Sequence, residues 1–333
     1  MTAKPPRPIV ILGPTAGGKS ELAVGLAEAV GGQVIGADSM QVYRHLDAGT
    51  AKPSRGLRQR VRHHLIDIVE PTERFTVADW LGRADPLVAQ IQDSNHHAVI
   101  VGGTNLYLKA LLEGLFEGPP GNPAVRQQFE GVSGLKLHER LGAVDPESAR
   151  RIHPNDRKKL VRALEVYQMT GKPISGFQRQ WNSDTTRPYR HNPILIGLAW
   201  SVEQINRRIN QRVKVMFYPG QAACESQTHN ALNKDADHIV PESLPEEVAR
   251  LQRDGLMGDQ VSQALGYKQV ICHFQGHDSV EQAFEKTKIA TRRFAKNQRT
   301  WLRRFREVKW IAVDHDQPTH VLKEAIKIVK AEK

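Results

Sequence analysis

Apolar residues gather along the chain into short runs that stop at glycine-rich turns. Residues 9–12 read Ile-Val-Ile-Leu and end at Gly13, as a fully buried parallel strand would. After Ser20 the apolar residues recur at helical spacing, and Gly31-Gly32 then supplies a left-handed helix end. The pattern therefore predicts a strand, a glycine-rich loop and a helix in series.

Further apolar runs predict more strands of the same sheet, at residues 34–37, 98–101, 194–198 and 308–313. The first of these leads into Asp38-Ser39, and the second leads into Gly102-Gly103-Thr104. Ligands of open parallel sheets bind outside the carboxyl ends of the strands. We therefore expect these two strand ends to line one crevice together with the loop after residue 12.

The residue composition of the sequence changes near residue 115. A proline-rich stretch is followed by charged, helix-prone sequence as far as about residue 178. We therefore expect an inserted helical domain over residues 119–190, between a first core part at 1–118 and a second at 191–333. Within the second part, residues 221–241 are polar, have little periodicity and predict a loop.

The composition favours a polyanionic partner. The 333-residue chain has a net charge of +11, and clustered Lys and Arg gain free energy by displacing counterions from phosphates. Cys224 and Cys272 lie far apart, which argues against a disulfide framework and fits a reducing compartment. The first residues lack a secretory signal, and no segment reaches the ~18 apolar residues of a membrane span. We expect a cytoplasmic protein, with a monomer as the default state.

Residues 13–20, Gly-Pro-Thr-Ala-Gly-Gly-Lys-Ser, match the phosphate-binding pattern G-x-x-x-x-G-K-[ST]. They lie between a predicted strand and a predicted helix, which is the context that the pattern requires. Glycines let successive backbone N–H groups point at phosphate oxygens, and the helix N-terminus adds a favourable partial charge. Lys19 would contact the terminal phosphate, and the Ser20 hydroxyl would ligate Mg²⁺.

The motif alone leaves the phosphate donor open. A nucleoside triphosphate would make the protein an ATP-dependent small-molecule kinase or an ATPase, with Asp38 holding magnesium. A diphosphate leaving group would let Asp38 face the acceptor as a general base. Aspartate at a strand end is also a common turn or cap residue. The physics of the motif does not choose among these interpretations.

Segments throughout the chain resemble the tRNA dimethylallyltransferase (IPP transferase) family, in the family's order. Besides the phosphate-binding loop they include Asp38-Ser-Met-Gln-Val-Tyr-Arg44, Gly49-Thr-Ala-Lys-Pro53, His64-Leu-Ile-Asp-Ile68, Val101-Gly-Gly-Thr-Asn-Leu-Tyr107, His153-Pro-Asn-Asp156, Arg162-Ala-Leu-Glu-Val166, Gly266-Tyr-Lys-Gln269 and Thr291-Arg-Arg-Phe-Ala-Lys-Asn-Gln298. Thr300-Trp-Leu-Arg303 extends the resemblance near the C-terminus.

The resemblance implies an α/β fold, with a P-loop NTPase-like (nucleotide-kinase-like) parallel sheet flanked by helices and an inserted α-helical domain that binds tRNA. It implies transfer of a dimethylallyl group from dimethylallyl diphosphate to N6 of adenine 37 in the anticodon stem-loop, with release of diphosphate. The base would be flipped into a channel that the donor enters from the opposite end. An ATP-dependent small-molecule kinase and an RNA-binding ATPase are the alternatives.

The resemblance also implies roles for individual residues. Asp38 would accept the N6 proton, and Thr104 would contact donor phosphate or help to position Asp38. Arg208 and Arg212 share a helix face, and we take Arg212 as the arginine that acts on the diphosphate. The donor diphosphate would bind Arg208 and the loop residues Gly13, Pro14, Thr15, Ala16, Gly17, Gly18, Lys19 and Ser20. The tRNA would bind Asp38, Ser39, Met40, Gln41, Thr104, Arg126, Lys158, Lys159, Arg162, Gln263, Gly266, Tyr267 and Lys268.

Six basic residues near the C-terminus are spaced so that one helix stripe would hold them: Lys288, Arg292, Lys296, Arg299, Arg303 and Arg306. Such a stripe fits either a solvated face or a surface for RNA phosphates.

The sequence departs from the family pattern at residues 217–243, which look like an insertion. Ser243 stands where the family usually has glycine, and the insertion puts the geometry on the donor side in question. Cys224, His229 and His238 lie in this insertion, but they supply too few ligands for a zinc site.

Overall fold

The computed structural model describes residues 5–116, 118–182, 188–220, 242–313 and 318–332. The chain forms two compact units, one made of residues 1–112 and 190–333 and the other of residues 113–189. The second unit is helical wherever it has regular structure among its described residues.

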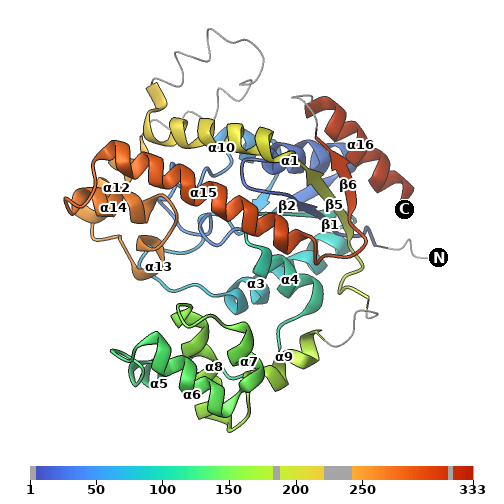
Figure 1. Cartoon of the computed structure of the whole chain (residues 1–333). Helices are drawn as coiled ribbons and strands as arrows, with labels where there is room; N and C mark the ends of the chain where they lie inside the picture. Colours follow the sequence, from blue (N-terminus) through green and yellow to red (C-terminus); the bar gives the residue numbers. More distant parts are fainter. Residues whose placement is uncertain (1–4, 117, 183–187, 221–241, 314–317, 333) are drawn as a thin grey trace. The chain divides into compact units, whose positions relative to one another are not determined.

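The first unit contains a six-stranded sheet in which all pairings are parallel (Figure 1). Its strands stand in the order β3, β2, β4, β1, β5, β6, and their bounds are Ile9–Leu12 for β1, Gly32–Gly36 for β2, His63–His64 for β3, His97–Val101 for β4, Ile194–Ala199 for β5 and Lys309–Ala312 for β6. The five strands predicted from apolar runs are confirmed. The two-residue β3 is too short to produce such a run.

Both faces of the sheet are covered at its centre, which explains why β1 and β4 are buried along their whole length, whereas the edge strand β6 is largely exposed. Ile9 and Ile11 join one core cluster with α1 (Lys19–Val30), α2 (Arg55–Arg60) and α16 (Pro318–Ala331). The helices α3 (Val77–Asp93) and α4 (Asn105–Glu113) carry Trp80 and Tyr107, whose rings stack at 4.8 Å. The indole of Trp80 donates to the Gly36 carbonyl at 2.8 Å and so ties α3 to the end of β2.

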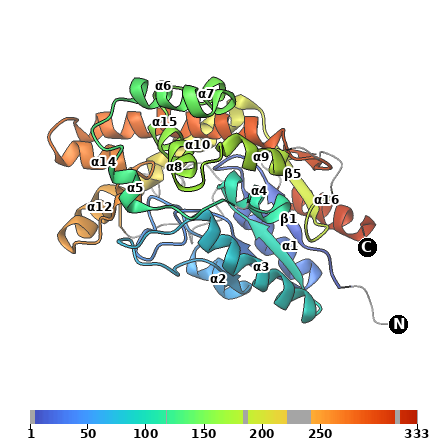
Figure 2. The ribbon, with the colours of Figure 1, turned by 90° about the horizontal axis from the view of Figure 1, so that it is seen from below.

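The predicted helix after the phosphate-binding loop is α1, and Gly31 caps it with φ 68° in the left-handed region, as expected. Among the described residues, this unit also contains the helices α10 (Val202–Phe217), α12 (Leu244–Arg253), α13 (Asp259–Ser262), α14 (Tyr267–Phe274) and α15 (Val280–Leu302). The long α15 packs against α10 and α14, and it runs beside α10 in both views (Figure 1, Figure 2).

The helical unit contains α5 (Pro123–Gln127), α6 (Gly134–Val144), α7 (Pro146–Arg151), α8 (Arg157–Thr170) and α9 (Ile174–Asn182). Leu137, Leu141 and Leu160 are fully buried in its own core cluster. Among the described residues of the chain, no helix is long and apolar enough to cross a membrane.

Candidate active site

The phosphate-binding loop connects β1 to α1 and depends on glycine at two positions. Gly18 adopts φ 77° at the N-terminus of α1. A Cβ on Gly17 would lie 2.9 Å from the Pro14 carbonyl oxygen and 3.2 Å from the indole nitrogen of Trp200. That nitrogen already donates to the Gly17 carbonyl at 3.1 Å, so the loop is held tightly against the end of β5. A side chain on residue 17 would therefore crowd the loop, and one on residue 18 would be strained by the positive φ.

Lys19 is buried in this loop, with its Nζ donating to the Pro14 carbonyl at 2.7 Å. Burial is the main cause that lowers the pKa of Lys19 to about 8; the positive charge of Arg212 adds to this lowering, and Asp38 and Glu21 oppose it. A bound phosphate would replace the lost hydration of the ammonium with a negative charge. The ammonium therefore carries a charge that an anion would stabilise.

This pKa predicts a pH dependence of anion binding. In the free protein Lys19 loses its proton as the pH rises through about 8, and the neutral amine has no charge to offer an anion. Relative to Lys19→Met, we expect the dissociation constant of inorganic pyrophosphate for the wild type, measured by calorimetry, to be constant below pH 8 and to rise by up to about tenfold per pH unit above it. Lys19→Met should lack this rise, and parallel curves for the two proteins would contradict the assignment, because ionisation of the ligand affects both equally.

Two arginines of α10 reach the same loop. Arg212 donates through Nη1 to the Thr15 hydroxyl at 3.1 Å and through Nη2 to the Thr50 carbonyl at 3.2 Å. Burial lowers the pKa of Arg212 below its usual value. Arg208 donates to the Ala16 carbonyl at 2.7 Å and stacks over Trp200 at 5.0 Å. The structure thus brings both predicted arginines to the phosphate-binding loop.

Asp38 stands at the carboxyl end of β2, on the loop that faces the phosphate-binding loop. Its Oδ1 accepts the backbone N–H groups of Met40 at 2.9 Å and Gln41 at 3.3 Å, so it does hold a turn. Among the described residues, Oδ2 has no hydrogen-bond donor. The negative charge of Asp38 partly opposes the lowering of the pKa values of Lys19 and Arg212, so the carboxylate lies within electrostatic reach of both cations. One oxygen is structural, and the other is available to a substrate.

Thr104 follows β4 and is hydrogen-bonded to the loop that contains Asp38. Its Oγ1 accepts the Ser39 N–H at 2.8 Å and donates to the Ser39 hydroxyl at 3.1 Å. Its own N–H donates to the Ala37 carbonyl at 3.1 Å. Thr104 therefore contacts the residues on either side of Asp38, which supports the positioning role among the two that the resemblance implies.

The two strand ends approach so closely at Gly102 that a side chain there is excluded. A Cβ on Gly102 would lie 2.0 Å from the Ala37 carbonyl oxygen. We expect Gly102→Ala to push the ends of β2 and β4 apart and to lower the free energy of unfolding, measured with urea, by about 1–3 kcal/mol.

The matched control is Gly82→Ala, in α3, where an added Cβ meets nothing within 4 Å. It should raise the free energy of unfolding by up to about 1 kcal/mol, because alanine costs less backbone entropy than glycine in a helix. Equal effects of the two substitutions would contradict the close approach at Gly102.

The loop of residues 47–51 is held by a buried carboxylate that the sequence did not point to. Glu247 of α12 is fully buried and accepts the N–H groups of Asp47, Ala48 and Gly49 at 2.7, 2.7 and 3.3 Å. Burial raises the pKa of Glu247. The same loop presents the Thr50 carbonyl to Arg212 and, at 3.2 Å, to the Gln41 amide. Arg212 on the donor side and Gln41 on the acceptor side therefore donate hydrogen bonds to the same carbonyl oxygen.

The predicted RNA-binding residues between the end of α13 and the first turn of α14 divide into exposed and buried ones. Gln263 and Lys268 are exposed. The Tyr267 ring is fully buried, and its hydroxyl donates to Glu247 at 2.6 Å, so the expectation of a surface contact with RNA is wrong for this side chain. Gly266 adopts φ 91°, which favours glycine. Both residues shape the fold behind the loop of residues 47–51.

The predicted RNA-binding residues of the helical unit divide in the same way. Lys158 and Lys159 are exposed on α8. Arg126 and Arg162 both bind the fully buried Glu165, at 2.8 and 2.6 Å. Burial opposes ionisation of Glu165, but hydrogen bonds from the two arginines hold its pKa below the usual value. Arg126 and Arg162 thus have a structural partner within their own unit.

The predicted basic stripe is confirmed in part. Helix α15 ends at Leu302 and Arg303 caps it, so the placement of Arg306 on the helix is wrong. Arg292 donates to Asn210 of α10 at 2.9 Å, and Lys288 pairs with Glu285 at 2.7 Å. Four cations of α15 and its C-terminal cap form no ion pair with a carboxylate among the described residues. They are Arg293, Lys296, Arg299 and Arg303.

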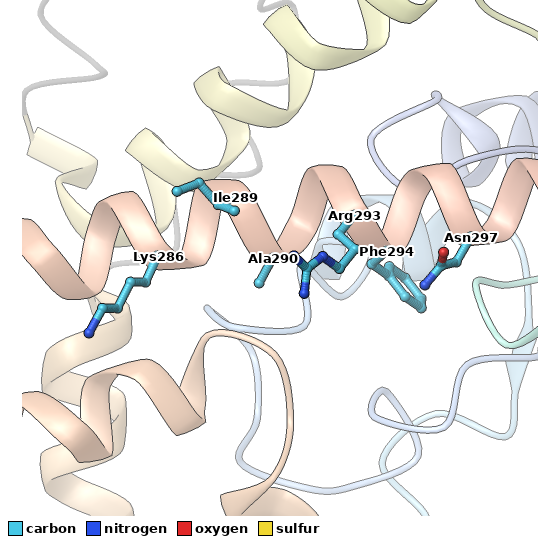
Figure 3. A pocket seen from close by; sticks show the side chains of 6 residues that line it. All are labelled: Lys286, Ile289, Ala290, Arg293, Phe294 and Asn297. Atoms are coloured by element: carbon cyan, nitrogen blue, oxygen red, sulfur yellow. The ribbon is translucent and has the colours of Figure 1, made fainter. Parts of the chain in front are cut away.

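The surface of α15 around these cations also contains exposed apolar side chains. A hollow of about 290 Å³ is lined by Lys286, Ile289, Ala290, Arg293, Phe294 and Asn297. Figure 3 shows these side chains on α15. A second hollow of about 480 Å³ lies between α10 and α15 and is lined by Val202, Asn206, Arg292, Arg293, Lys296, Asn297 and Arg299. Both hollows are therefore lined by apolar side chains and by cations of α15.

The predicted insertion at 217–243 lies mostly outside the described residues, which stop at Gly220 and resume at Glu242. Cys224, His229 and His238 are among the residues outside. Ser243, where glycine was expected, begins α12 with a capping box: its Oγ accepts the Glu246 N–H, and the Glu246 carboxylate accepts the Ser243 N–H at 2.7 Å. Serine at this position therefore has a local structural reason.

Comparison with known proteins gives consistent results. A family model described as IPP transferase matches residues 41–223 and 222–305. A protein of Geobacter sulfurreducens named tRNA dimethylallyltransferase is 42% identical over 308 residues, covering 91% of each chain. A Thermoanaerobacter protein of the same name is 39% identical over 325 residues, covering 96% of this chain and 95% of the relative.

Solved structures resemble the chain over almost its whole length. The tRNA isopentenylpyrophosphate transferase of Bacillus halodurans has a TM-score of 0.65 and 31% identity, covering 98% of this chain and 97% of its own. A eukaryotic dimethylallyltransferase crystallised acting on tRNA has a TM-score of 0.72, and at 23% identity this likeness concerns the fold alone.

Proposed function

The chain belongs to the IPP transferase family, and we propose that it transfers a dimethylallyl group from dimethylallyl diphosphate to N6 of adenine 37 in tRNA. The relatives are named for this transfer and not for phosphate transfer from ATP, which favours prenyl transfer over the kinase interpretation. The observation that carries the proposal is the pairing of an anion cradle after β1 with the Asp38 carboxylate after β2, at the same edge of the sheet on either side of β4. Among the described residues, Oδ2 of this carboxylate accepts no hydrogen bond.

The reaction would proceed by exchange of one bond for another. The allylic C–O bond breaks, and its electron pair leaves with the diphosphate, which is held by the loop N–H groups, Lys19 and Arg212. The N6 nitrogen forms the new C–N bond with the allylic carbon. As nitrogen is alkylated its proton becomes acidic and passes to Oδ2 of Asp38. An ordinary carboxylate suffices for this step if it lies within hydrogen-bond reach.

The possible metal ligands of the site fit a magnesium ion that takes further ligands from the bound diphosphate. Among the described residues, no group of three or more His, Cys, Asp or Glu side chains could hold a metal. Ser20, in the first turn of α1, offers a hydroxyl oxygen beside the phosphate-binding loop. We propose that Ser20 and the diphosphate oxygens would hold Mg²⁺, which would neutralise charge on the leaving group.

The unpaired cations of α15 support tRNA as the acceptor, since they can bind phosphates without first breaking a salt bridge. Gln263 and Lys268 of the same unit are exposed and can add contacts to RNA. Lys158 and Lys159 are exposed on the helical unit, which can contribute contacts of its own. We propose that the anticodon stem-loop is the part of tRNA that is bound, with the target base flipped toward Asp38. A cytoplasmic location is proposed because tRNA is the acceptor.

A single assay tests the proposed function. The protein is incubated with Mg²⁺, unmodified tRNA and dimethylallyl diphosphate labelled in the allyl group, and in parallel with ATP labelled in the γ-phosphate. We expect the allyl label in tRNA, at adenine 37 when the RNA is digested and mapped. Transfer of the γ-phosphate without allyl transfer would favour the kinase interpretation and reject ours.

A further inference from the structure

One side chain of α15 connects the two loops that the proposed reaction uses. Gln298 is 2% exposed, and its carboxamide lies between the phosphate-binding loop and the loop after β4. Oε1 accepts the Thr15 N–H at 2.8 Å, and Nε2 donates to the Gly103 carbonyl at 2.8 Å. The orientation of the amide is determined by its partners, because a backbone N–H only donates and a carbonyl oxygen only accepts.

The connection reaches the donor side through Thr15. The Thr15 N–H is used by Gln298, and the Thr15 hydroxyl accepts from Arg212 at 3.1 Å. Thr15 is therefore held by α15 on its backbone and by α10 on its side chain. Because both contacts are made within the protein, the start of the phosphate-binding loop has a fixed position relative to α15.

The connection reaches the acceptor side at Gly103. A Cβ built on Gly103 would lie 3.0 Å from Oδ2 of Asp38 and 3.3 Å from Nε2 of Gln298. The free carboxylate oxygen and the amide nitrogen thus converge on the same glycine. Thr104, the next residue, holds the Asp38 loop through Ser39. A shift of Gly103 would consequently move the support of the general base.

Helix α15 can fix the positions of the two loops relative to each other. It spans 23 residues, and Arg292 fastens it to Asn210 of α10 at 2.9 Å. The Gln298 backbone carbonyl also accepts the Asn105 amide at 3.4 Å at the start of α4. The helix cannot move toward one loop without straining its contacts to the other.

We infer that Gln298 is a positioning residue for allyl transfer, which sets the separation between the departing diphosphate and the base that receives the N6 proton. The inference rests on the proposed function. A glutamine is needed because its amide supplies one acceptor and one donor at the two ends of a short span. The side chain acts through Thr15 and Gly103 and has no contact of its own with the substrates.

The first test is Gln298→Met, which keeps the length of the side chain and removes both hydrogen bonds. We expect kcat to fall by about 10- to 100-fold, because a misplacement of about 1 Å between reacting groups has an effect of this size. The dissociation constants of inorganic pyrophosphate and of tRNA, each measured alone, should change less than about threefold. A loss of kcat without a matching loss of binding is the mark of positioning.

The second test is Gln298→Glu, which keeps an acceptor for Thr15 but has no donor for Gly103 when ionised. It should retain the pyrophosphate affinity of the wild type and still lose kcat, because the acceptor side is released. The matched control is Thr287→Val, on the same helix, where a buried hydroxyl donates to the Ala283 carbonyl at 2.8 Å and contacts neither loop. It should lower the unfolding temperature and leave kcat unchanged.

The outcomes separate this inference from the function on which it rests. If the wild type transfers label to tRNA and Gln298→Met transfers it equally fast, the positioning role is overturned and the function stands. The role is also overturned if kcat falls only as far as in Thr287→Val at equal loss of stability. If the wild type itself transfers no label, the proposed function and the role fall together.

Discussion

Asp38→Asn should reduce kcat for allyl transfer by about 10²- to 10⁴-fold, which is the usual contribution of a general base. The substitution is sharper than Asp38→Ala because an asparagine oxygen can still accept the N–H groups of Met40 and Gln41 that Oδ1 now accepts. What changes is the second oxygen, which becomes an amide nitrogen without basicity. The turn is kept and the proton acceptor is lost. Single-turnover rates at saturating tRNA and donor measure the effect.

The control for this substitution is Asp93→Asn, at the exposed end of α3, which changes the net charge of the protein by the same amount. Both variants should bind tRNA about as tightly as the wild type in a filter-binding assay. If Asp38→Asn instead loses tRNA affinity and turns over normally on saturating RNA, Asp38 is an RNA-binding residue and not the base.

Lys19→Met should lower kcat/KM for dimethylallyl diphosphate by about 10²- to 10³-fold, since the ammonium stabilises charge that develops on the leaving group. Methionine keeps the aliphatic stem of the buried side chain and removes its charge. The KM for tRNA should stay within a few fold of the wild-type value. Initial rates with each substrate varied separately measure both effects.

Unfolding by urea distinguishes a specific loss of donor use in Lys19→Met from misfolding. Misfolding would lower the stability of the variant, whereas removal of the buried charge should not. Burial lowers the pKa of Lys19 to about 8, so the unfolded chain binds more protons at this residue than the folded chain between pH 8 and about 10.5. The charged lysine therefore destabilises the folded protein at pH 7, and this penalty fades as the pH rises through that window. Lys19→Met should unfold at the same or a higher urea concentration than the wild type at pH 7.

Lys323→Ala, on the exposed face of α16, removes a positive charge far along the sequence from the loop and should leave donor kinetics unchanged. An unfolding midpoint of Lys19→Met well below that of the wild type would mean that Lys19 serves the fold. In that case the loss of donor use would not measure phosphate binding.

Several features of the site could be predicted from sequence because each depends on neighbours in the chain. The phosphate-binding loop needs Gly17 and Gly18 for local curvature, and the strand before it and the helix after it have clear periodicities. Asp38 and Thr104 could be placed at one crevice because each follows closely on an apolar run that ends at the same edge of the sheet, and the family resemblance then implied their roles. For the same reason all five of the longer strands were predicted correctly.

The features that were missed or misjudged depend on residues far apart in sequence. Tyr267 was expected at the RNA surface, yet its hydroxyl binds Glu247 in the interior, and no local pattern marks a tyrosine that is paired in this way. Arg306 continues the basic spacing of α15 but lies beyond the end of the helix, because spacing alone does not say where a helix stops. Ser243 was read as a departure from glycine, although the Glu246 three residues later is a recognisable capping-box signal.

The sequence by itself determined the order of strands and helices along the chain, the anion-binding curve of the phosphate-binding loop, the strand ends at which polar groups gather and the excess of positive charge. These depend on backbone preferences and on interactions within a few residues. The tertiary structure alone decided which cations reach the loop, which oxygen of Asp38 is free, and how Gln298 joins Thr15 to Gly103 across 283 and 195 positions of sequence. Contacts of that span arise only when the sheet and α15 pack together, because burial brings their polar groups into reach and requires each to find a partner.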